Sequence, residues 1–299
     1  MLAAYIKLLR PKQYSKNLLV FAALLFTGNF SNIDQVIRAL IAFLAMCMAS
    51  SATYIINDLI DLERDRAHPV KKNRPIASGK VSPKLAIAIA ALLFIGAVAI
   101  GVYLNKASAA LIAFYAIMQA AYNIRLKHIA ISDVFVISLG FILRATLGAA
   151  AVGVAISGWL LLCTGALALM LGFGKRRHEF LLQGDERGSS REVLKQYTLE
   201  LLNNLVVSTA TSAALCYAIY VMESTNARNH PLLIFTVIFV AYGVCRYLYL
   251  IFGKGEGGEP ETLLVTDPHI WGTILGFVII AVIAIKFPYH FPMVELSPK

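Results

Sequence analysis

LAIAIAALLFIGAVAIGVYLN, residues 85–105, has no charged side chain and is long enough to cross a bilayer, which takes about 20 residues as an α-helix. Comparable runs occupy residues 36–57, 145–174, 199–222 and 268–285. The whole chain is 59% hydrophobic and 15% charged, whereas a soluble domain carries roughly 25% charged residues. Most of the surface therefore faces something other than water.

These runs predict an all-α fold, a polytopic transmembrane bundle of about nine helices, because the ten-residue alternation of an outer-membrane barrel is absent. The run 145–174 is long enough for two spans, with a turn at Gly153 and at Ser157-Gly158. The first apolar stretch has no small-residue cleavage site after it, so we expect it to be an uncleaved span. The predicted spans are residues 17–31, 36–58, 83–104, 107–125, 132–153, 157–175, 198–222, 231–252 and 268–287.

The basic residues predict the orientation of these spans. With the N-terminus inside, twenty of the 27 Lys and Arg residues lie at inner segments, five at outer segments and two within spans. This asymmetry indicates a multi-pass protein of the cytoplasmic (inner) membrane, with its active face toward the cytoplasm. The expected organisation is a single integral membrane domain, residues 1–299, with cytoplasmic catalytic loops at 59–82, 126–131, 176–197 and 253–267.

Composition also limits the other classes of site. The basic residues sit beside spans and no soluble domain is visible, so nucleic acid is not an expected partner. All four cysteines fall in predicted spans without a CxxC pair, so we expect packing residues and neither disulfides nor a zinc site. The cysteines are Cys47, Cys163, Cys216 and Cys245.

The glutamates of 253–267, namely Glu256, Glu259 and Glu261, are expected to be solvated.

The motif that points to chemistry is NDLIDLERDR, residues 57–66, at the end of the second predicted span. Asp58, Asp61 and Asp65 are spaced i, i+3 and i+7, which places them on one face of an α-helix. Stacked carboxylates repel one another unless a cation lies among them, and Mg²⁺ commonly binds one or two carboxylates together with substrate phosphates. The alternative is a solvated helix end.

The loop AHPVKKNRPIASGKVSP, residues 67–83, follows this motif directly and interleaves cations with prolines that stop helix formation. Cations beside metal-binding carboxylates would suit a diphosphate, because Lys supplies a point charge and Arg a bidentate fork. Alone, the same loop could serve only as a positive-inside anchor. Its candidate residues are Lys71, Lys72 and Arg74.

Two further inner clusters and one deep arginine complete the candidates. YNIRLKHIAISD, residues 122–133, offers Tyr122, Lys127 and Asp133, and GFGKRRHEF, residues 172–180, contains Lys175 and Glu179 at i, i+4 spacing with Arg176 between them. Arg144 lies well inside a predicted span, where a charge is expected to face a polar cavity or to form a buried ion pair.

The whole set of motifs resembles the UbiA superfamily of intramembrane prenyltransferases and, within it, the branch of decaprenyl-phosphate phosphoribosyltransferases. NDLIDLERDR is typical of the superfamily. The resemblance to the branch rests on LLRPKQYSKNLLVFAALLF, YNIRLKHIAISDVFVISLGFILRATLGAAAV, FGKRRHEF, REVLKQYT and CRYLYLIFGKGEGGEPETLLVTDPHIW, and it runs over nearly the whole chain.

One departure from the superfamily pattern bears on the substrate. Aromatic prenyltransferases of this superfamily usually carry a second Asp-rich motif at the end of span six, where this chain has Lys175-Arg176-Arg177-His178-Glu179. Cations in that place suit a donor with more phosphate than a prenyl diphosphate. The resemblance implies phosphoribosyl pyrophosphate as donor, a polyprenyl phosphate lipid as acceptor, pyrophosphate as product and Mg²⁺ as cofactor. A homo-oligomer is compatible with the sequence.

The resemblance also implies roles for residues. The catalytic and metal-binding residues would be Asp58, Asp61 and Asp65. The substrate-binding residues would be Lys16, Asn17, Asn57, Arg66, Lys71, Lys72, Arg74, Tyr122, Lys127, Asp133, Arg144, Lys175, Arg176 and Glu179.

Three other functions compete with this interpretation. An aromatic prenyltransferase of the same fold would use a prenyl diphosphate and a hydroxybenzoate-like acceptor, but the absent second Asp motif counts against it. A secondary transporter of anionic solutes would often show internal repeats, and the second half has no clear repeat of NDLIDLERDR. A non-catalytic membrane scaffold would not need carboxylates stacked beside cations.

Overall fold

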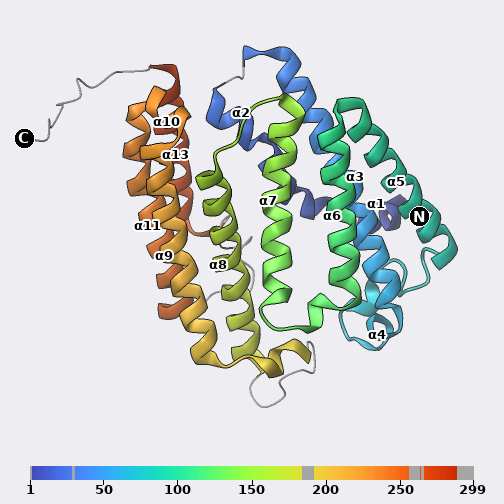
Figure 1. The fold of residues 1–299 in the computed structure, drawn as a ribbon. Coiled ribbons are helices and arrows are strands. Elements are labelled where there is room, and N and C mark those ends of the chain that lie inside the picture. The colour runs from blue at the N-terminus through green and yellow to red at the C-terminus, as the bar shows by residue number, and fades with distance from the viewer. Residues whose placement is uncertain (1, 29–30, 184–191, 256–262, 264–265, 288–299) are drawn as a thin grey trace, which may run out of the picture. The chain divides into compact units, whose positions relative to one another are not determined.

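The computed structural model describes residues 2–28, 31–183, 192–255, 263 and 266–287. Within these residues every regular element is a helix and no strand occurs (Figure 1), which confirms the predicted all-α fold. Most of the predicted inner loop 253–267, with Glu256, Glu259 and Glu261, lies outside the described residues.

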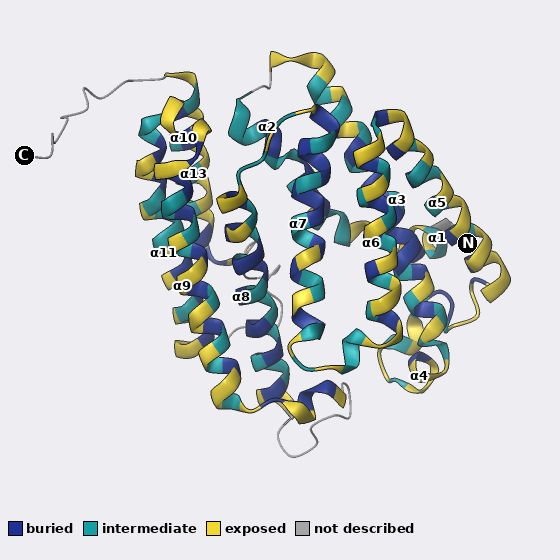
Figure 2. Ribbon diagram, viewed as in Figure 1, coloured by how far each residue is buried: buried dark blue, intermediate teal, exposed yellow. Residues whose placement is uncertain are grey.

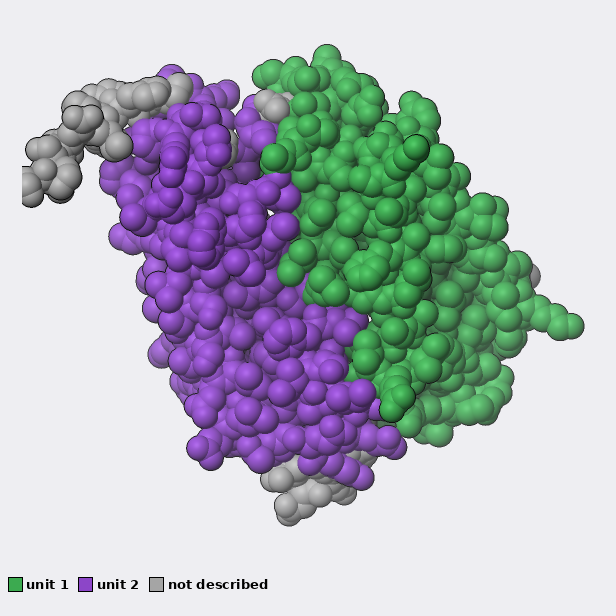
Figure 3. Space-filling view, viewed as in Figure 1, with its two compact units in different colours: residues 1–25, 29–127, 139–155 green, residues 26–28, 128–138, 156–299 purple. Residues whose placement is uncertain are grey.

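The chain divides into two compact units (Figure 3). Unit 1 comprises residues 1–25, 29–127 and 139–155, and unit 2 comprises residues 26–28, 128–138 and 156–299. The single domain expected from the sequence stays a prediction.

Unit 1 contains four long helices and several short ones. Its elements are α1 (Leu2–Leu9), the 3₁₀ helix η1 (Pro11–Phe21), most of α2 (Ala22–Thr27), α3 (Ile33–Ile60), α4 (Leu62–Ala67), η3 (Lys71–Asn73), α5 (Pro83–Leu104), α6 (Lys106–Ile124) and the greater part of α7 (Ser132–Val152).

Small residues allow the helices of unit 1 to approach closely. A Cβ atom on Gly96 of α5 would lie 2.4 Å from the Met48 side chain of α3. A Cβ atom on Gly101 would lie 2.9 Å from the backbone of Ala109 in α6. Such interfaces are typical of membrane helices, whose association depends on close packing because lipid is as apolar as the side chains.

Unit 2 is built mainly from four long helices. Its elements are the first turns of α7, α8 (Gly158–Gln183), η5 (Glu192–Gln196), α9 (Leu199–Glu223), α10 (Thr225–Asn229), η6 (Pro231–Thr236), α11 (Val237–Gly253) and α13 (Pro268–Lys286). Along the sequence, the chain passes from unit 1 to unit 2 within η4 (Leu126–His128).

Polar residues at the N-terminal ends of the predicted spans fix several helix boundaries. The side chains of Ser82, Asn105 and Thr198 accept hydrogen bonds from backbone N–H groups in the first turns of α5, α6 and α9. These N-caps satisfy donors that have no partner within the helix.

Eight of the described helical segments are long and apolar enough to cross a membrane. Many residues on these helices are exposed (yellow in Figure 2). Large hydrophobic residues are among them, for example Leu92, which is 71% exposed, and Ile238, which is 69% exposed. Exposed apolar area of this extent requires lipid around it. The chain is therefore a multi-pass membrane protein.

The expected turn inside the run 145–174 is confirmed. Helix α7 ends at Val152, and Gly153 follows with a φ of 72°, a left-handed conformation that glycine adopts without steric cost. Helix α8 then begins at Gly158.

Two predicted boundaries were wrong. The segment 17–31 is not one long α-helix in the described residues, because the 3₁₀ helix η1 occupies Pro11–Phe21 and α2 ends before Gly28, whose φ is 69°. The loop expected from residue 176 starts later, because α8 continues to Gln183 and carries the basic cluster on helical turns.

Gly148 provides a test of the packing in unit 1. A Cβ atom at this position of α7 would lie 1.9 Å from the backbone oxygen of Val20 in η1. Backbone cannot give way as a flexible side chain can, so we expect Gly148→Ala to lower the free energy of unfolding by about 1–3 kcal/mol. Thermal unfolding in detergent measures this. Gly272→Ala is the control, because a Cβ there meets nothing within 4 Å; equal melting temperatures for the two variants would contradict the packing.

Candidate functional site

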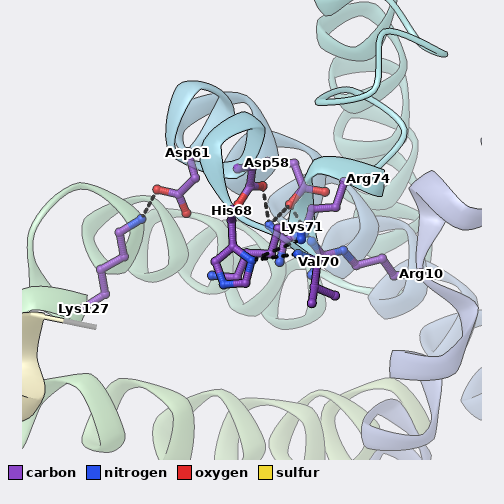
Figure 4. Close-up of polar contacts among 9 residues, drawn as sticks. Arg10, Asp58, Asp61, His68, Val70, Lys71, Arg74 and Lys127 are labelled. Carbon is purple, nitrogen blue, oxygen red and sulfur yellow. Dashed lines mark hydrogen bonds and ion pairs between the residues drawn. The ribbon is translucent and has the colours of Figure 1, made fainter. Parts of the chain in front are cut away.

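The aspartate-rich motif lies where α3 gives way to α4. Helix α3 ends at Ile60, and Asp61, with φ −89° and ψ 10°, joins it to α4. The backbone hydrogen bonds continue across this junction, from the Asp61 N–H to the Asn57 oxygen at 3.0 Å and from the Asp65 N–H to the Asp61 oxygen at 2.8 Å. The three carboxylates thus follow one another at nearly helical spacing, but Asp61 points toward Lys127 whereas Asp58 points toward Arg74 (Figure 4).

Asp58 and Asp65 share one cation. Nη1 of Arg74 donates to Oδ1 of Asp58 at 2.9 Å and to Oδ2 of Asp65 at 2.5 Å (Figure 4). Arg10 donates to the same Oδ1 of Asp58. The carboxylates are 3% and 2% exposed, and buried charges require such paired and hydrogen-bonded partners.

Asp61 has a different partner. Its Oδ1 atom accepts a hydrogen bond from the Lys127 ammonium at 2.8 Å, which ties the end of α3 to the segment after α6 (Figure 4). The structure therefore brings five of the predicted residues into two ion networks, with Asp58, Asp65 and Arg74 in one and Asp61 and Lys127 in the other. Arg10 is an addition that the sequence interpretation had missed.

The proline-containing loop holds Arg74 by packing its neighbours. Ile76 and Val81 are buried in a hydrophobic cluster with Leu8 and Ile55. The Val81 N–H donates to the Pro75 oxygen at 3.0 Å, which closes the loop on itself. Because both sides of the loop are anchored in this way, Arg74 is directed at the carboxylates by the core of unit 1.

The other predicted residues of this region differ in their exposure. Arg66 pairs with the exposed Glu63 at 2.8 Å. Lys72 is exposed, whereas Lys16, Asn57, Lys71 and Tyr122 are partly buried. Their predicted binding roles stay predictions.

A second polar cluster of unit 1 surrounds Arg144. This buried guanidinium donates to Asn17 Oδ1 at 2.8 Å, to the Gly140 oxygen at 2.6 Å and to the Tyr115 hydroxyl at 3.2 Å. It also lies over the ring faces of Tyr115 and Phe141, with centroid distances of 5.1 and 5.6 Å. All of these partners are uncharged, so the described residues provide dipoles and aromatic faces for this cation, and no carboxylate.

Unit 2 contains a third network, centred on Asp133. Its Oδ2 atom accepts from Nε of Arg176 at 2.6 Å, and its Oδ1 atom accepts from the Tyr197 hydroxyl at 2.7 Å. Arg176 also donates to Glu179 at 2.8 Å. Asp133 has no exposed surface, so in this conformation it contacts only protein groups. Burial and the bond to Asp133 raise the pKa of Tyr197, which keeps the hydroxyl protonated as a donor.

The neighbouring residues of α8 have different surroundings. Arg177 donates to Asn203 at 2.7 Å and to the Ile251 oxygen at 3.1 Å, so it links α8 to α9 and α11. Lys175 is partly buried on the same helix. The basic cluster seen in the sequence is thus divided, and Arg177 has a structural role between helices.

The donor set of the aspartate motif fits Mg²⁺ only in part. Among the described residues, no three acidic, histidine or cysteine side chains converge to hold a metal by themselves. Asp58 and Asp65 do converge, since both carboxylates reach one nitrogen of Arg74. Two hard oxygen ligands agree with the preference of Mg²⁺ for one or two carboxylates completed by substrate phosphates.

Two residues besides Arg10 were missed in the sequence, and they are aromatic. Tyr115 contacts Arg144, and Tyr197 contacts Asp133. Tyr197 lies in REVLKQYT, which had been noted only for its resemblance. A tyrosine next to an apolar run gives no periodic signal, so its pairing with a buried charge depends on tertiary structure.

Known proteins resemble this chain in sequence and in fold. The decaprenyl-phosphate phosphoribosyltransferase of Mycolicibacterium smegmatis is 34% identical to this chain, over 89% of it and 87% of that protein. The protein of the same name from Corynebacterium glutamicum is also 34% identical, over 96% of this chain and 87% of its own. Both relatives bear out the resemblance inferred from the motifs.

A solved UbiA homologue from Archaeoglobus fulgidus, bound to DMAPP and Mg²⁺, has a TM-score of 0.71 against this structure at 16% identity, covering 94% of this chain and 99% of that one. At such low identity this is a likeness of fold. The model of the UbiA prenyltransferase family matches residues 18–258. Because this model covers most of the chain and both relatives are 34% identical to it, the chain belongs to the UbiA prenyltransferase family.

Proposed function

We propose that this chain transfers the 5-phosphoribosyl group of phosphoribosyl pyrophosphate to a polyprenyl phosphate and releases pyrophosphate, in a Mg²⁺-dependent reaction. The observation that carries the proposal is the convergence of the buried carboxylates Asp58 and Asp65 on one cation, because it creates a charged site suited to a diphosphate. The names of the two relatives support the choice of donor and acceptor.

The cations of α8 support the donor further. Lys175 and Arg176 stand where aromatic prenyltransferases of this superfamily usually have carboxylates. A donor that carries a phosphate in addition to its diphosphate needs more positive charge than a prenyl diphosphate does. We therefore propose that Lys175 and Arg176 bind donor phosphate.

The reaction forms a bond between a phosphate oxygen of the acceptor and C1 of the ribose. The bond from C1 to the diphosphate oxygen breaks, and its electron pair leaves with pyrophosphate. Negative charge therefore grows on the departing group, where Arg10, Arg74 and Lys127 supply positive charge at the motif. The acceptor phosphate is already an anion at neutral pH, so no strong general base is needed.

Asp58 and Asp65 are the residues that would hold Mg²⁺. When bound there, the ion would neutralise charge on the diphosphate. Asp61, which the sequence had grouped with them as a ligand, would instead keep Lys127 in place through their ion pair. We further propose that these residues face the cytoplasm, because the inner segments carry most of the Lys and Arg residues.

The activity can be tested directly by measuring pyrophosphate release from the purified protein with Mg²⁺. We expect release with phosphoribosyl pyrophosphate and a polyprenyl phosphate together, and none when either is omitted. The matched assay contains a prenyl diphosphate and 4-hydroxybenzoate. Release only in the matched assay would show an aromatic prenyltransferase, and the cations of α8 would then have been misinterpreted.

Asp58→Asn tests the metal site. The amide keeps the shape of the side chain but removes one of the two carboxylates, so we expect turnover to fall at least roughly 100-fold, since a metal ion contributes several kcal/mol to charge stabilisation. Turnover is measured across a Mg²⁺ titration, and thermal unfolding checks that the variant folds.

Glu63→Gln is the control for this variant, because it removes a carboxylate that is 82% exposed from α4. It should leave both turnover and the Mg²⁺ dependence unchanged. Wild-type turnover in folded Asp58→Asn would rule out Asp58 as a metal ligand.

Lys175→Ala tests the donor contact of α8. Loss of one charge-assisted hydrogen bond to phosphate should weaken donor binding by roughly tenfold or more and leave the KM for the lipid acceptor unchanged. Direct titration with phosphoribosyl pyrophosphate gives the donor Kd. Lys195→Ala is the control, because Lys195 is an exposed cation of the same unit. An unchanged donor Kd in Lys175→Ala would refute the assignment.

A further inference from the structure

The segment before α7 contains a strained backbone. Ile131 has a φ of 70°, in the left-handed region where a β-branched side chain crowds its own backbone. It is one of two residues other than glycine with positive φ in the described chain, and Arg10 is the other. Such a conformation persists only where surrounding contacts impose it.

Two consecutive residues from a distant part of the chain provide these contacts. The Tyr197 hydroxyl accepts the Ile131 N–H at 2.6 Å. The Gln196 side chain accepts the Ala130 N–H at 3.1 Å and donates to the His128 oxygen at 2.9 Å. We name Gln196 and Tyr197 the loop clamp.

The clamp is connected to the basic cluster of α8 through Asp133. The Tyr197 hydroxyl has one proton, which it gives to Oδ1 of Asp133, while its oxygen accepts from Ile131. The other oxygen of Asp133 accepts from Nε of Arg176. One hydroxyl therefore links the strained turn, the buried carboxylate and the guanidinium in a single line of hydrogen bonds.

We propose that Tyr197 is a positioning residue for Arg176. Its hydroxyl holds Ile131 in the left-handed conformation and so fixes Asp133, which in turn orients the guanidinium. The proposal rests on the proposed function, because Arg176 is assigned there to donor phosphate. Asp133, predicted from the sequence to contact substrate, then acts through Arg176 and does not itself reach a ligand.

Tyr197→Phe isolates the hydroxyl. The ring stays in its hydrophobic cluster with Phe180 and Leu194, so burial of the side chain is retained. Tyr247→Phe is the matched control, because Tyr247 belongs to the same cluster and its buried hydroxyl has no hydrogen-bond partner among the described residues. A general effect of removing a tyrosine hydroxyl from this core would appear in both variants.

Ile131→Gly provides a second test, because it removes the strain itself. Glycine adopts a φ near 70° without steric cost, and Ile131 is 41% exposed, so its side chain is only partly buried. If the hydroxyl works by holding a strained turn, its removal should change the donor KM less once the turn is no longer strained. The double variant with Tyr197→Phe measures this coupling.

The first measurement is hydrogen exchange of the peptide that covers residues 128–134. We expect faster exchange at the Ile131 N–H in Tyr197→Phe and unchanged exchange in Tyr247→Phe. This readout needs no substrate and is therefore independent of the proposed function. Unchanged exchange in Tyr197→Phe would overturn the proposal that the hydroxyl of the loop clamp holds the turn.

The second measurement is turnover with phosphoribosyl pyrophosphate and a polyprenyl phosphate. We expect Tyr197→Phe to raise the donor KM by roughly tenfold, to leave the acceptor KM unchanged, and to have an effect below about threefold in the Ile131→Gly background. A donor KM equal to that of Tyr247→Phe would show that the hydroxyl only stabilises the fold, and would overturn the positioning role. Absence of turnover in the wild-type protein would instead count against the proposed function, while faster exchange would still support the clamp.

Discussion

The cost of burying charge in a low-dielectric interior governs the arrangement of this protein. Asp58, Asp65 and Asp133 are almost completely buried, and an unpaired carboxylate at such a position would be strongly unfavourable. Each is therefore held by an arginine within hydrogen-bond distance. Arg10 lies 48 residues from Asp58 and Arg176 lies 43 from Asp133, so these ion pairs also connect parts of the chain that are far apart in the sequence.

Backbone strain accompanies these networks. The two non-glycine residues with positive φ in the described chain are Arg10 and Ile131, one in each unit. Arg10 pairs with Asp58, and Ile131 is held by the hydroxyl that also binds Asp133. Strain at such places is tolerated when the surrounding contacts over-determine the conformation, and it is commonly concentrated at functional sites.

The sequence was sufficient for most of the spans and insufficient for the ion pairs. Apolar length reports directly on burial in lipid, so the turn at Gly153 and the start of α5 at Pro83 followed from the pattern. The prediction of one span over residues 17–31 was wrong, because apolar length alone does not reveal the 3₁₀ helix η1. The aspartate motif was evident from its spacing. The division of its carboxylates between two ion networks was not. Arg10 lies 48 residues from Asp58 and Lys127 lies 66 from Asp61, so only tertiary structure decides which cation each carboxylate receives.

The loop clamp has a consequence for the synthesis of the chain. Gln196 follows the segment that it holds by 66 to 68 residues. At a synthesis rate of about 5–20 residues per second, the turn at Ile131 is synthesised roughly three to thirteen seconds before its partners. During that interval the N-terminal end of α7 must wait in a relaxed backbone conformation. The final conformation of the turn before α7 is therefore set by a later segment of the nascent chain.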